Sequence, residues 1–302
     1  MQITIYRTKK RKERLSINIY DIWFSNLDIS NRVKLKLLED YGNSKNIWEL
    51  EESELVKNEV NSKYILKILD KNNRVHLDKY LTIMERYSIK LVSCNDFEYP
   101  TSLKYIENKP AYLYVRGKIE NLYDDCVAIV GSRNASSYGK FVAKKISKEI
   151  ADRNVNVVSG LAVGIDKYAH LGALESKIGK TIAVLGSGIL DSDLYPLENK
   201  KVFERILENN GTIITEFKLG CKPEKYNFPL RNRIISGISK KIIVVEAKEN
   251  SGSLITVNYA LEQGKEVFAV PGNITSINSK GTNNIIFEGA RIFRDVEDIF
   301  NS

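Results

Sequence analysis

Cysteine, histidine and proline are scarce in this 302-residue chain, which has three, two and six of them. The cysteines Cys94, Cys126 and Cys221 are odd in number and far apart, so they form neither a disulfide framework nor a metal site. Few prolines beside 43% hydrophobic residues are typical of a protein that is folded throughout. Long apolar runs are missing too, which argues against a membrane span and against a secretion signal. We therefore expect a cytoplasmic protein without membrane contact.

The shortage of histidine also argues against hydrolytic chemistry. His170 lies in the helical stretch DKYAHLGAL, where we expect a packed or capping residue and not a general base. Ser132 follows an expected strand, but Gly131-Ser132-Arg133 lacks the glycines that flank the serine of a nucleophile elbow. The best-placed carboxylates, Asp166 and Glu246, have structural roles open to them, as helix caps or as partners of arginines. We expect a protein that is not an enzyme.

Two glycine motifs that could indicate a cofactor are incomplete. Gly186-Ser187-Gly188 lacks the third glycine of the dinucleotide fingerprint, and no acidic residue closes the next strand as expected. Gly179-Lys180-Thr181 imitates the end of a phosphate-binding loop, but Leu174 stands where its partner glycine belongs. We expect neither a cofactor nor a metal ion.

Glycine is nearly absent from the first part of the chain, since 16 of its 18 glycines follow Lys118. From Tyr20 to Tyr87 apolar residues recur mostly at three- and four-residue steps, which predicts helices, two of them short and joined at Tyr41–Ser44. We assign residues 1–90 to a small helical domain, similar in pattern to a SAM or helix-hairpin-helix module. The run Arg7–Arg14 has six basic residues and one acid, and is more typical of a solvated chain end than of a nucleic-acid-binding arm.

Residues 91–302 form the second predicted domain, which has an α/β pattern. Short apolar and β-branched runs predict strands at Ile89–Val92, Cys126–Val130, Asn156–Ser159, Thr181–Leu185, Thr212–Thr215, Lys241–Val245, Glu266–Val270 and Ala290–Phe293. Between them we expect helices at Tyr138–Arg153, Ile165–Ser176, Lys200–Glu208, Asn232–Gly237, Leu254–Glu262 and Thr282–Glu288. Strands without alternation are buried on both faces, and helices between them form right-handed crossovers. The fold class is therefore α/β: a doubly wound, mainly parallel, extended Rossmann-like sheet preceded by a small helical domain, with Asp96–Gly117 as a surface connector.

One segment of this domain is strongly basic. Between Lys218 and Lys241 it has seven lysines or arginines and a single acid, Glu224, and the whole chain has a formal net charge of +8. Tyr226 and Phe228 lie among these cations, so the segment offers charge for phosphates and flat surfaces for unpaired bases. The alternatives are a solvated face for the cations and a core contact for Phe228.

Glycine-rich or polar turns follow several of the strands. They lie at Gly131–Gly139, Ser159–Asp166, Gly186–Pro196 and Pro271–Asn273, and SGSL at Ser251–Leu254 opens a helix. Glycine lets backbone approach an oxyanion, and serine hydroxyls, N–H groups and an arginine can bond to it. Because ligands bind beyond the carboxyl ends of parallel strands, we expect these turns to converge at one edge of the sheet beside the basic segment.

These motifs, taken in order, resemble the DprA/Smf family of DNA-processing proteins. The resemblance runs from Val127 to Ile299 and rests on VAIVGSR, VVSGLAVGIDKYAHLGAL, GKTIAVLGSGILDSDLYPLEN, TEF, FPLRNRIISGIS, IIVVEAKENSGSLITVNYALEQGKEVFAVPGN and KGTNNIIFEGA. It implies a homodimer that binds single-stranded DNA without sequence specificity and loads RecA recombinase onto it during natural transformation, with no catalytic step.

The resemblance also implies the DNA-binding residues, by matching motifs. They are Ser132, Arg133, Ser159, Gly160, Lys225, Phe228, Arg231, Asn232, Arg233, Ser251, Gly252, Ser253, Gly272 and Asn273. One of the two arginines of the RNR motif is expected to face the DNA strand and the other to hold Glu246. Val163 departs from the family pattern, where many relatives have a basic residue. Since the chain ends at Ser302, we also expect no C-terminal winged-helix module.

Two other function classes stay open at this point. The fold and an acid such as Glu262 resemble nucleoside-monophosphate phosphoribohydrolases, although SGSLITVNYALE lacks the double glycine of their PGGxGTxxE pattern and places the acid later. The remaining alternative is a dimeric scaffold for recombination proteins, in which any DNA contact is incidental.

Overall fold

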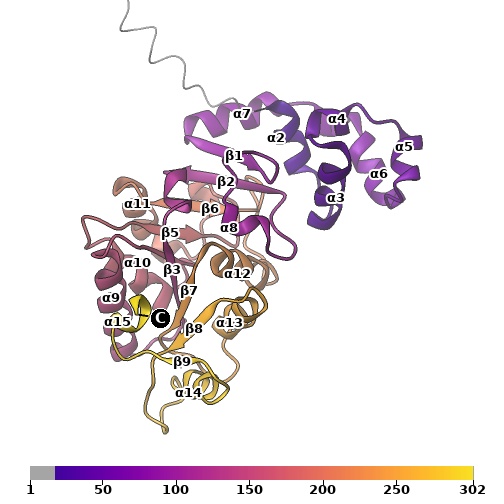
Figure 1. Ribbon diagram of the computed structural model, residues 1–302. Coiled ribbons are helices and arrows are strands. Elements are labelled where there is room, and N and C mark those ends of the chain that lie inside the picture. Colours follow the sequence, from indigo (N-terminus) through magenta and orange to yellow (C-terminus); the bar gives the residue numbers. More distant parts are fainter. Residues whose placement is uncertain (1–17, 302) are drawn as a thin grey trace, which may run out of the picture. The chain divides into compact units, whose positions relative to one another are not determined.

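The computed structural model describes residues 18–301 (Figure 1). The basic run Arg7–Arg14 lies outside the described residues. The chain divides into two compact units, Met1–Arg86 and Tyr87–Ser302. The division falls a few residues before the 90/91 boundary expected from the sequence, and it leaves the first strand in the second unit.

The described part of the first unit is helical, as predicted. It consists of α2 (Ile19–Asn26), α3 (Asn31–Tyr41), α4 (Ser44–Trp48), α5 (Glu52–Lys57), α6 (Ser62–Leu69), the 3-10 turn η1 (Lys71–Arg74) and α7 (Leu77–Arg86). The rings of Trp23 and Trp48 meet edge to face with centroids 5.0 Å apart. The Arg74 guanidinium lies 4.3 Å from the Trp48 ring centroid and donates to the Trp48 carbonyl at 2.8 Å. A cation over aromatic faces stabilises this small core, in which burial lowers the pKa of Arg74.

The second unit is built on one nine-stranded sheet in the order β1-β2-β6-β5-β4-β3-β7-β8-β9. Its strands are β1 (Ile89–Ser93), β2 (Tyr112–Gly117), β3 (Cys126–Val130), β4 (Asn156–Ser159), β5 (Thr181–Val184), β6 (Thr212–Thr215), β7 (Lys241–Val244), β8 (Glu266–Ala269) and β9 (Arg291–Ile292). The seven strands β3 to β9 are parallel to one another. At one edge of the sheet β2 pairs antiparallel with both β6 and β1. The mainly parallel sheet is confirmed. The expected connector Asp96–Gly117 is wrong at its end, because β2 pairs there with β6.

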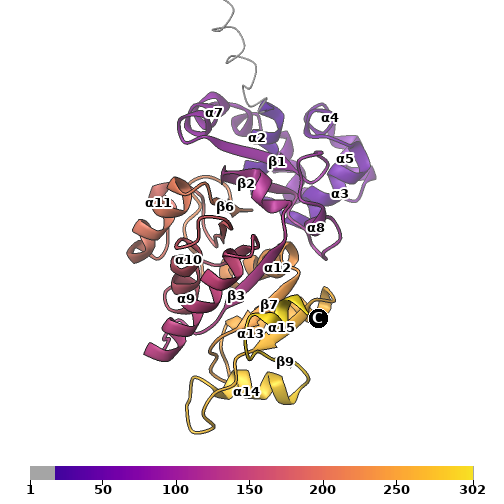
Figure 2. The ribbon, with the colours of Figure 1, turned by 60° about the vertical axis from the view of Figure 1, so that its left-hand side comes forward.

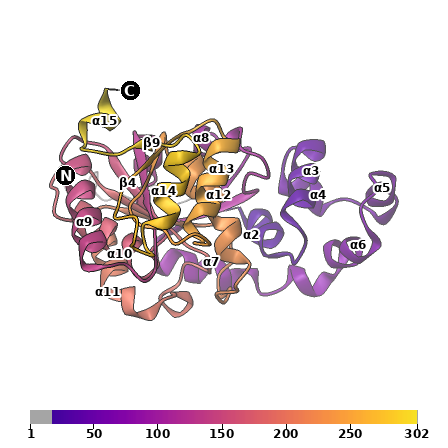
Figure 3. The same cartoon turned by 90° about the horizontal axis from the view of Figure 1, so that it is seen from below.

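Helices cover both faces of this sheet. They are α8 (Thr101–Lys104), α9 (Ser137–Ala151), α10 (Ile165–Ala173), α11 (Lys200–Glu208), α12 (Asn227–Ile238), α13 (Ser253–Glu262), α14 (Lys280–Phe287) and α15 (Glu297–Phe300), with 3-10 turns at Ile119–Leu122, Asp191–Asp193 and Leu197–Asn199. α9, α10 and α11 lie on one side of the sheet, and α12, α13 and α14 on the other (Figures 2 and 3). None of the helices in residues 18–301 is both long enough and apolar enough to span a membrane.

The order of the strands reverses at β3. From β3 the chain adds β4, β5 and β6 on one side, then returns through α12 to add β7 on the other side of β3. The turns that follow β3 and β7 therefore lead to helices on opposite faces, α9 and α13. Such a switch point leaves a crevice at the carboxyl ends of the two strands, the usual ligand site of a doubly wound sheet.

Candidate nucleic-acid interface

A cavity of about 720 Å³ lies at this switch point. Its wall combines the turn after β3, the segment that enters α12 and the turn before α13. Nine of the fourteen predicted residues line it: Ser132, Arg133, Lys225, Phe228, Arg231, Asn232, Ser251, Gly252 and Ser253. The structure thus brings together three segments that are more than a hundred residues apart at their extremes.

Phe228, in the first turn of α12, is the aromatic centre of this cavity. One side of its ring faces the Arg133 guanidinium, whose central carbon is 5.2 Å from the ring centroid. Tyr195 is a second aromatic neighbour, with ring centroids 5.7 Å apart. Gly186 lies behind the ring, where a Cβ would come within 2.8 Å of a ring carbon. The half-buried ring is therefore held in position by its neighbours, and it borders the cavity.

Cations surround this aromatic centre. Arg133 and Lys225 are exposed and Lys248 is half-buried, and all three line the cavity. Within residues 18–301 none of the three makes an ion pair with a carboxylate. Their charge is therefore available to a polyanion.

The turn Ser251–Ser253 borders the cavity at the N-terminus of α13. The hydroxyl oxygens of Ser251 and Ser253 are 2.8 Å apart, and no side chain caps the helix at Gly252. Asn232 donates to the Gly252 carbonyl at 3.3 Å, which ties α12 to this turn. The two hydroxyls thus bond to each other, and a helix N-terminus of this kind favours a phosphate.

Arg231 supports the cavity from below and offers little surface to a ligand. It is 4% exposed, and its guanidinium donates to the carbonyl of Gly160 at 2.7 Å and to that of Val184. Burial lowers the pKa of Arg231 to about 10, while the nearby Asp166 opposes that shift. Burial raises the pKa of the Asp166 carboxyl, and Arg231 opposes this in turn. The charges of Arg231 and Asp166 therefore compensate each other in the buried layer under the cavity.

The predicted anion-binding role of Ser159 and Gly160 disagrees with their surroundings. Ser159 is fully buried and its hydroxyl donates to the Ile129 carbonyl at 2.7 Å. The Gly160 N–H donates to the Asp166 carboxylate at 3.1 Å, so this turn already holds an anion of the chain itself. Gly160 is not in the lining of the cavity and borders a smaller pocket of about 90 Å³, which shares Arg133, Tyr195 and Phe228 with the cavity.

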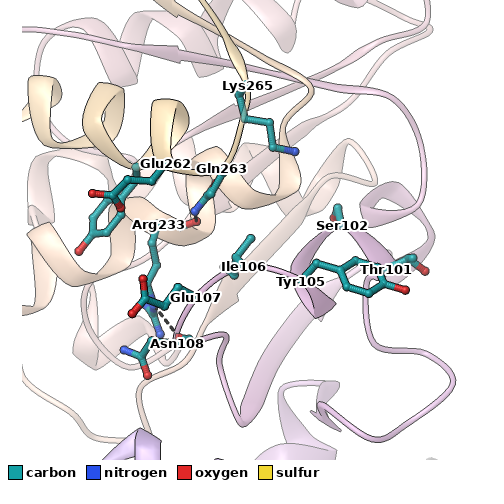
Figure 4. A pocket seen from close by; sticks show the side chains of 11 residues that line it. Thr101, Ser102, Tyr105, Ile106, Glu107, Asn108, Arg233, Glu262, Gln263 and Lys265 are labelled. Atoms are coloured by element: carbon teal, nitrogen blue, oxygen red, sulfur yellow. Dashed lines mark hydrogen bonds between the residues drawn. The ribbon is translucent and has the colours of Figure 1, made fainter.

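Arg233 is a structural residue. It is 2% exposed and forms a bidentate ion pair with Glu216, with N–O distances of 2.5 and 2.7 Å, beside a hydrogen bond to the Asn108 carbonyl at 2.9 Å. It lines a separate pocket of about 610 Å³ (Figure 4). Helical residues two apart do not share a face, which explains why Arg231 and Arg233 point to different places.

The expectation that one of these arginines holds Glu246 is wrong. The Glu246 carboxylate accepts from the N–H of Ser136 at 2.9 Å and from the Ser136 hydroxyl. Ser136 is the N-cap of α9, and it in turn accepts from the Gly139 N–H at 3.0 Å. Glu246 thus fixes the start of α9 by holding its N-cap residue, and is not itself a helix cap.

Gly272 and Asn273 lie outside the cavity lining. Gly272 exchanges two hydrogen bonds with the Asn283 side chain, both 3.1 Å long, and Asn273 accepts from the Thr275 N–H at 2.9 Å. Asn278 in the same loop donates to the carbonyl of Asn134, a lining residue of the cavity, at 3.1 Å.

Several lining residues are absent from the predicted set, among them the polar or aromatic side chains Asn134, Tyr195, Lys248 and Asn250. Asn134 and Tyr195 lie within turns that were singled out, and Lys248 and Asn250 directly precede Ser251. Their signal was therefore present, as polar or aromatic residues inside these turns or within three residues of them.

Comparisons with known proteins find a family model and relatives that match most of the chain. The model of the family described as DNA recombination-mediator protein A matches residues 90–302. DNA processing protein DprA of Bacillus subtilis is 40% identical over 225 residues, which is 74% of this chain and 74% of that protein. Protein Smf of Escherichia coli is 39% identical over 229 residues, and the match spans 76% of this chain but 60% of the relative.

Two solved structures are similar over most of the chain. DNA processing protein A from Streptococcus pneumoniae has a TM-score of 0.81 at 34% identity, covering 95% of this chain and 98% of that one. DNA processing protein A from Helicobacter pylori, whose structure concerns its single-stranded DNA binding mode, has a TM-score of 0.63 at 27% identity, covering 71% and 95%.

Proposed function

Because this chain belongs to the DNA recombination-mediator protein A family, we propose that it binds single-stranded DNA in the switch-point cavity, without sequence specificity. The observation that carries the proposal is the meeting of Arg133, Lys225, Phe228 and the Ser251–Ser253 turn on one cavity. Its volume of about 720 Å³ lies within the 300–1,000 Å³ that is usual for ligand sites. The relative from H. pylori, with its single-stranded DNA binding mode, supports the choice of ligand.

The chemistry of the cavity favours an unpaired strand. Arg133, Lys225 and Lys248 neutralise phosphates, and a base stacks at Phe228 or Tyr195, as it can only when it is not paired. Every base has a flat face, so contacts of this kind distinguish sequences poorly. Duplex DNA has its bases stacked inside and gains only the phosphate contacts.

The bound strand serves recombination in this proposal. The chain loads RecA recombinase onto single-stranded DNA during natural transformation, and it acts in the cytoplasm as a homodimer. The family description as a recombination mediator and the relatives described as DNA processing proteins support this assignment.

The protein acts by binding, without a catalytic step. The alternative, a nucleotide-cleaving enzyme, requires an acidic residue such as Glu262 beside the bound ligand. Glu262 is the last residue of α13 and lines the separate pocket of Arg233, whereas the cavity is at the other end of that helix. Asp166, which does border the cavity, is buried and held by the Gly160 N–H and the charge of Arg231.

Fluorescence anisotropy with single-stranded and duplex oligonucleotides across a salt series tests the proposal. If about four phosphates are neutralised, log affinity falls with log salt with a slope of roughly −3 for the single strand. Phe228→Ala weakens single-strand binding by about 1–3 kcal/mol, whereas Phe228→Tyr keeps most of it, because stacking needs an aromatic face. Arg133→Ala weakens binding to all sequences alike.

Lys177→Ala is the matched control. This exposed lysine precedes β5 and so lies at the amino ends of the strands, whereas the cavity lies at their carboxyl ends. The substitution should leave both affinity and salt slope unchanged. Duplex binding as tight as single-strand binding at equal salt, or a loss from Arg133→Ala that depends on sequence, would contradict the proposal.

A further inference from the structure

The outer face of α9 carries two aromatic side chains that no core contact explains. Tyr138 is 58% exposed and Phe141 is 67% exposed, while the opposite face of the helix buries Ala143, Ile146 and Ile150. With Lys145 and Lys148 they recur at steps of three, four and three residues, so all four lie on one side of the helix. We call Tyr138, Phe141, Lys145 and Lys148 the α9 face.

The first twelve residues of this helix have charges of one sign. From Ser137 to Lys148 the sequence SYGKFVAKKISK has four lysines and no acid. Lys140, in the first turn, opposes the helix macrodipole, whereas Lys148 lies in the last turn, where a cation is favourable. Ion pairs compensate the positive charge in part: Lys144 with Glu175 at 2.6 Å, and Lys148 with Asp152 at 2.5 Å. Lys145 is 3.8 Å from Glu149, a weak exposed contact.

The α9 face continues from the cavity. Arg133 and Asn134 line the cavity, and α9 starts at Ser137 in the same loop. Glu246 holds Ser136 and so fixes where the helix begins relative to that lining. From Tyr138 to Lys148 the helix rises by about 15 Å. α9 lies at the outside of the helix layer, next to α10 (Figures 1 and 2).

We propose that a single strand leaving the cavity beside Arg133 continues along the α9 face, where its bases stack on Tyr138 and Phe141 and its phosphates meet Lys145. This inference rests on the proposed function and extends it from a cavity to a longer binding track. Exposed aromatic rings beside lysines are the combination that tracks unpaired nucleic acid.

A second copy of the chain is the other possible occupant, and charge argues against it. In a two-fold contact each partner presents the same patch, and where the axis passes through this face α9 would meet α9. That arrangement places lysines against lysines, which is unfavourable. A polyanion is attracted to the same surface.

The test compares oligothymidylates of about 5 and about 12 nucleotides, within the usual site sizes for single-strand binders. In the variant Tyr138→Ala/Phe141→Ala the short oligonucleotide binds within about twofold of the wild type, because the cavity is intact. The long one loses about tenfold or more in affinity, because one or two stacked bases are lost. Lys145→Gln lowers the salt slope for the long oligonucleotide only.

Phe97→Ala/Tyr105→Ala is the control, because these aromatics are equally or more exposed, on a different part of the same unit. It should change neither affinity. The Tyr138→Ala/Phe141→Ala variant could bind both oligonucleotides as tightly as the wild type does. That result would overturn the binding track along the α9 face but would still support binding in the cavity. A shift of oligomeric state in light scattering without the length-dependent loss would assign the face to a contact between copies. If the wild type does not bind the short oligonucleotide, the proposed function fails, and the track with it.

Discussion

At the scale of single residues, the glycine-rich turns largely hold carboxylates of the chain itself. Asp166 accepts from Gly160, Glu246 from Ser136, and Asp193 from the N–H groups of Leu190 and Gly220 at 3.2 and 2.9 Å. A turn whose N–H groups converge binds any anion in reach. An internal carboxylate is always in reach. Within residues 18–301 the N–H groups of the Ser251–Ser253 turn donate to no carboxylate, which makes this turn the better candidate for a phosphate.

Arg233 provides a prediction at this scale. Removing one member of a buried ion pair leaves the other charge uncompensated, so Arg233→Met should destabilise the fold by about 3–5 kcal/mol. The double variant Arg233→Met/Glu216→Leu should recover most of that loss, since no buried charge is left without a partner. Urea unfolding of the three proteins measures this.

DNA affinity separates this structural role from direct binding. The folded Arg233→Met/Glu216→Leu variant should bind single-stranded DNA as tightly as the wild type does. A selective loss of affinity at normal stability would mean that Arg233 contacts the strand.

At the scale of elements, close backbone contacts set the position of the cavity walls. Gly164, the residue before α10, has φ +80°, and a Cβ there would lie 2.3 Å from the Ser132 carbonyl oxygen and 2.4 Å from that of Arg133. The N–H of Ile165 donates to the same Ser132 carbonyl at 3.1 Å. The start of α10 therefore holds the turn that presents Arg133.

Gly164→Ala should both destabilise the fold and weaken DNA binding, because the new methyl group displaces the backbone of this turn. Gly264→Ala is a close control: its φ is +66°, but a Cβ there has nothing within 4 Å. It should cost only the left-handed strain of about 1–2 kcal/mol and leave DNA affinity unchanged. Equal effects of the two substitutions on affinity would refute the role given to Gly164.

At the scale of the whole molecule, a buried histidine links stability to pH. His170 is fully buried in α10, and its Nδ1 is 2.7 Å from the Thr181 hydroxyl. That hydroxyl donates to the Val157 carbonyl at 2.8 Å, so Nδ1 is the donor toward Thr181. Burial, aided by the charge of Arg231, lowers the pKa of His170 to about 3. The ring is neutral and packed, as predicted from the sequence.

The pKa of His170 is lower in the folded protein than the ordinary value of about 6.5 in the unfolded chain. Its contribution to stability is therefore complete above pH 6.5 and is lost as pH falls toward 3, by up to about 1.4 kcal/mol per pH unit. Urea unfolding between pH 6.5 and 5 should show a steeper decline for the wild type than for His170→Gln.

The raised pKa of Asp166 has the opposite effect, since it increases stability as pH falls. Asp166 is present in both proteins, so its effect cancels in this comparison. The His170→Gln protein is expected to be less stable at every pH, so the slopes decide and not the absolute values. An NMR titration in which the His170 ring becomes protonated near pH 6 would contradict the prediction.

The sequence by itself determined the sheet and most of the cavity. Strands β3 to β8 are short apolar runs buried on both faces, a signal contained in a few consecutive residues. Carboxyl ends of parallel strands share one edge, so the sequence alone predicts that Arg133, Phe228 and Ser251 lie together. Local pattern and a general rule of topology sufficed for these.

Only the tertiary structure decided the rest. β2 exists because Tyr112–Gly117 pairs with β1 and with β6, which is about a hundred residues away. The direction of Arg231 and Arg233, the partner of Glu246 and the anion held at Gly160 likewise depend on which distant groups arrive beside them. Hydrogen bonds and ion pairs form between whatever polar groups burial brings into contact, and residue spacing along the chain does not encode that.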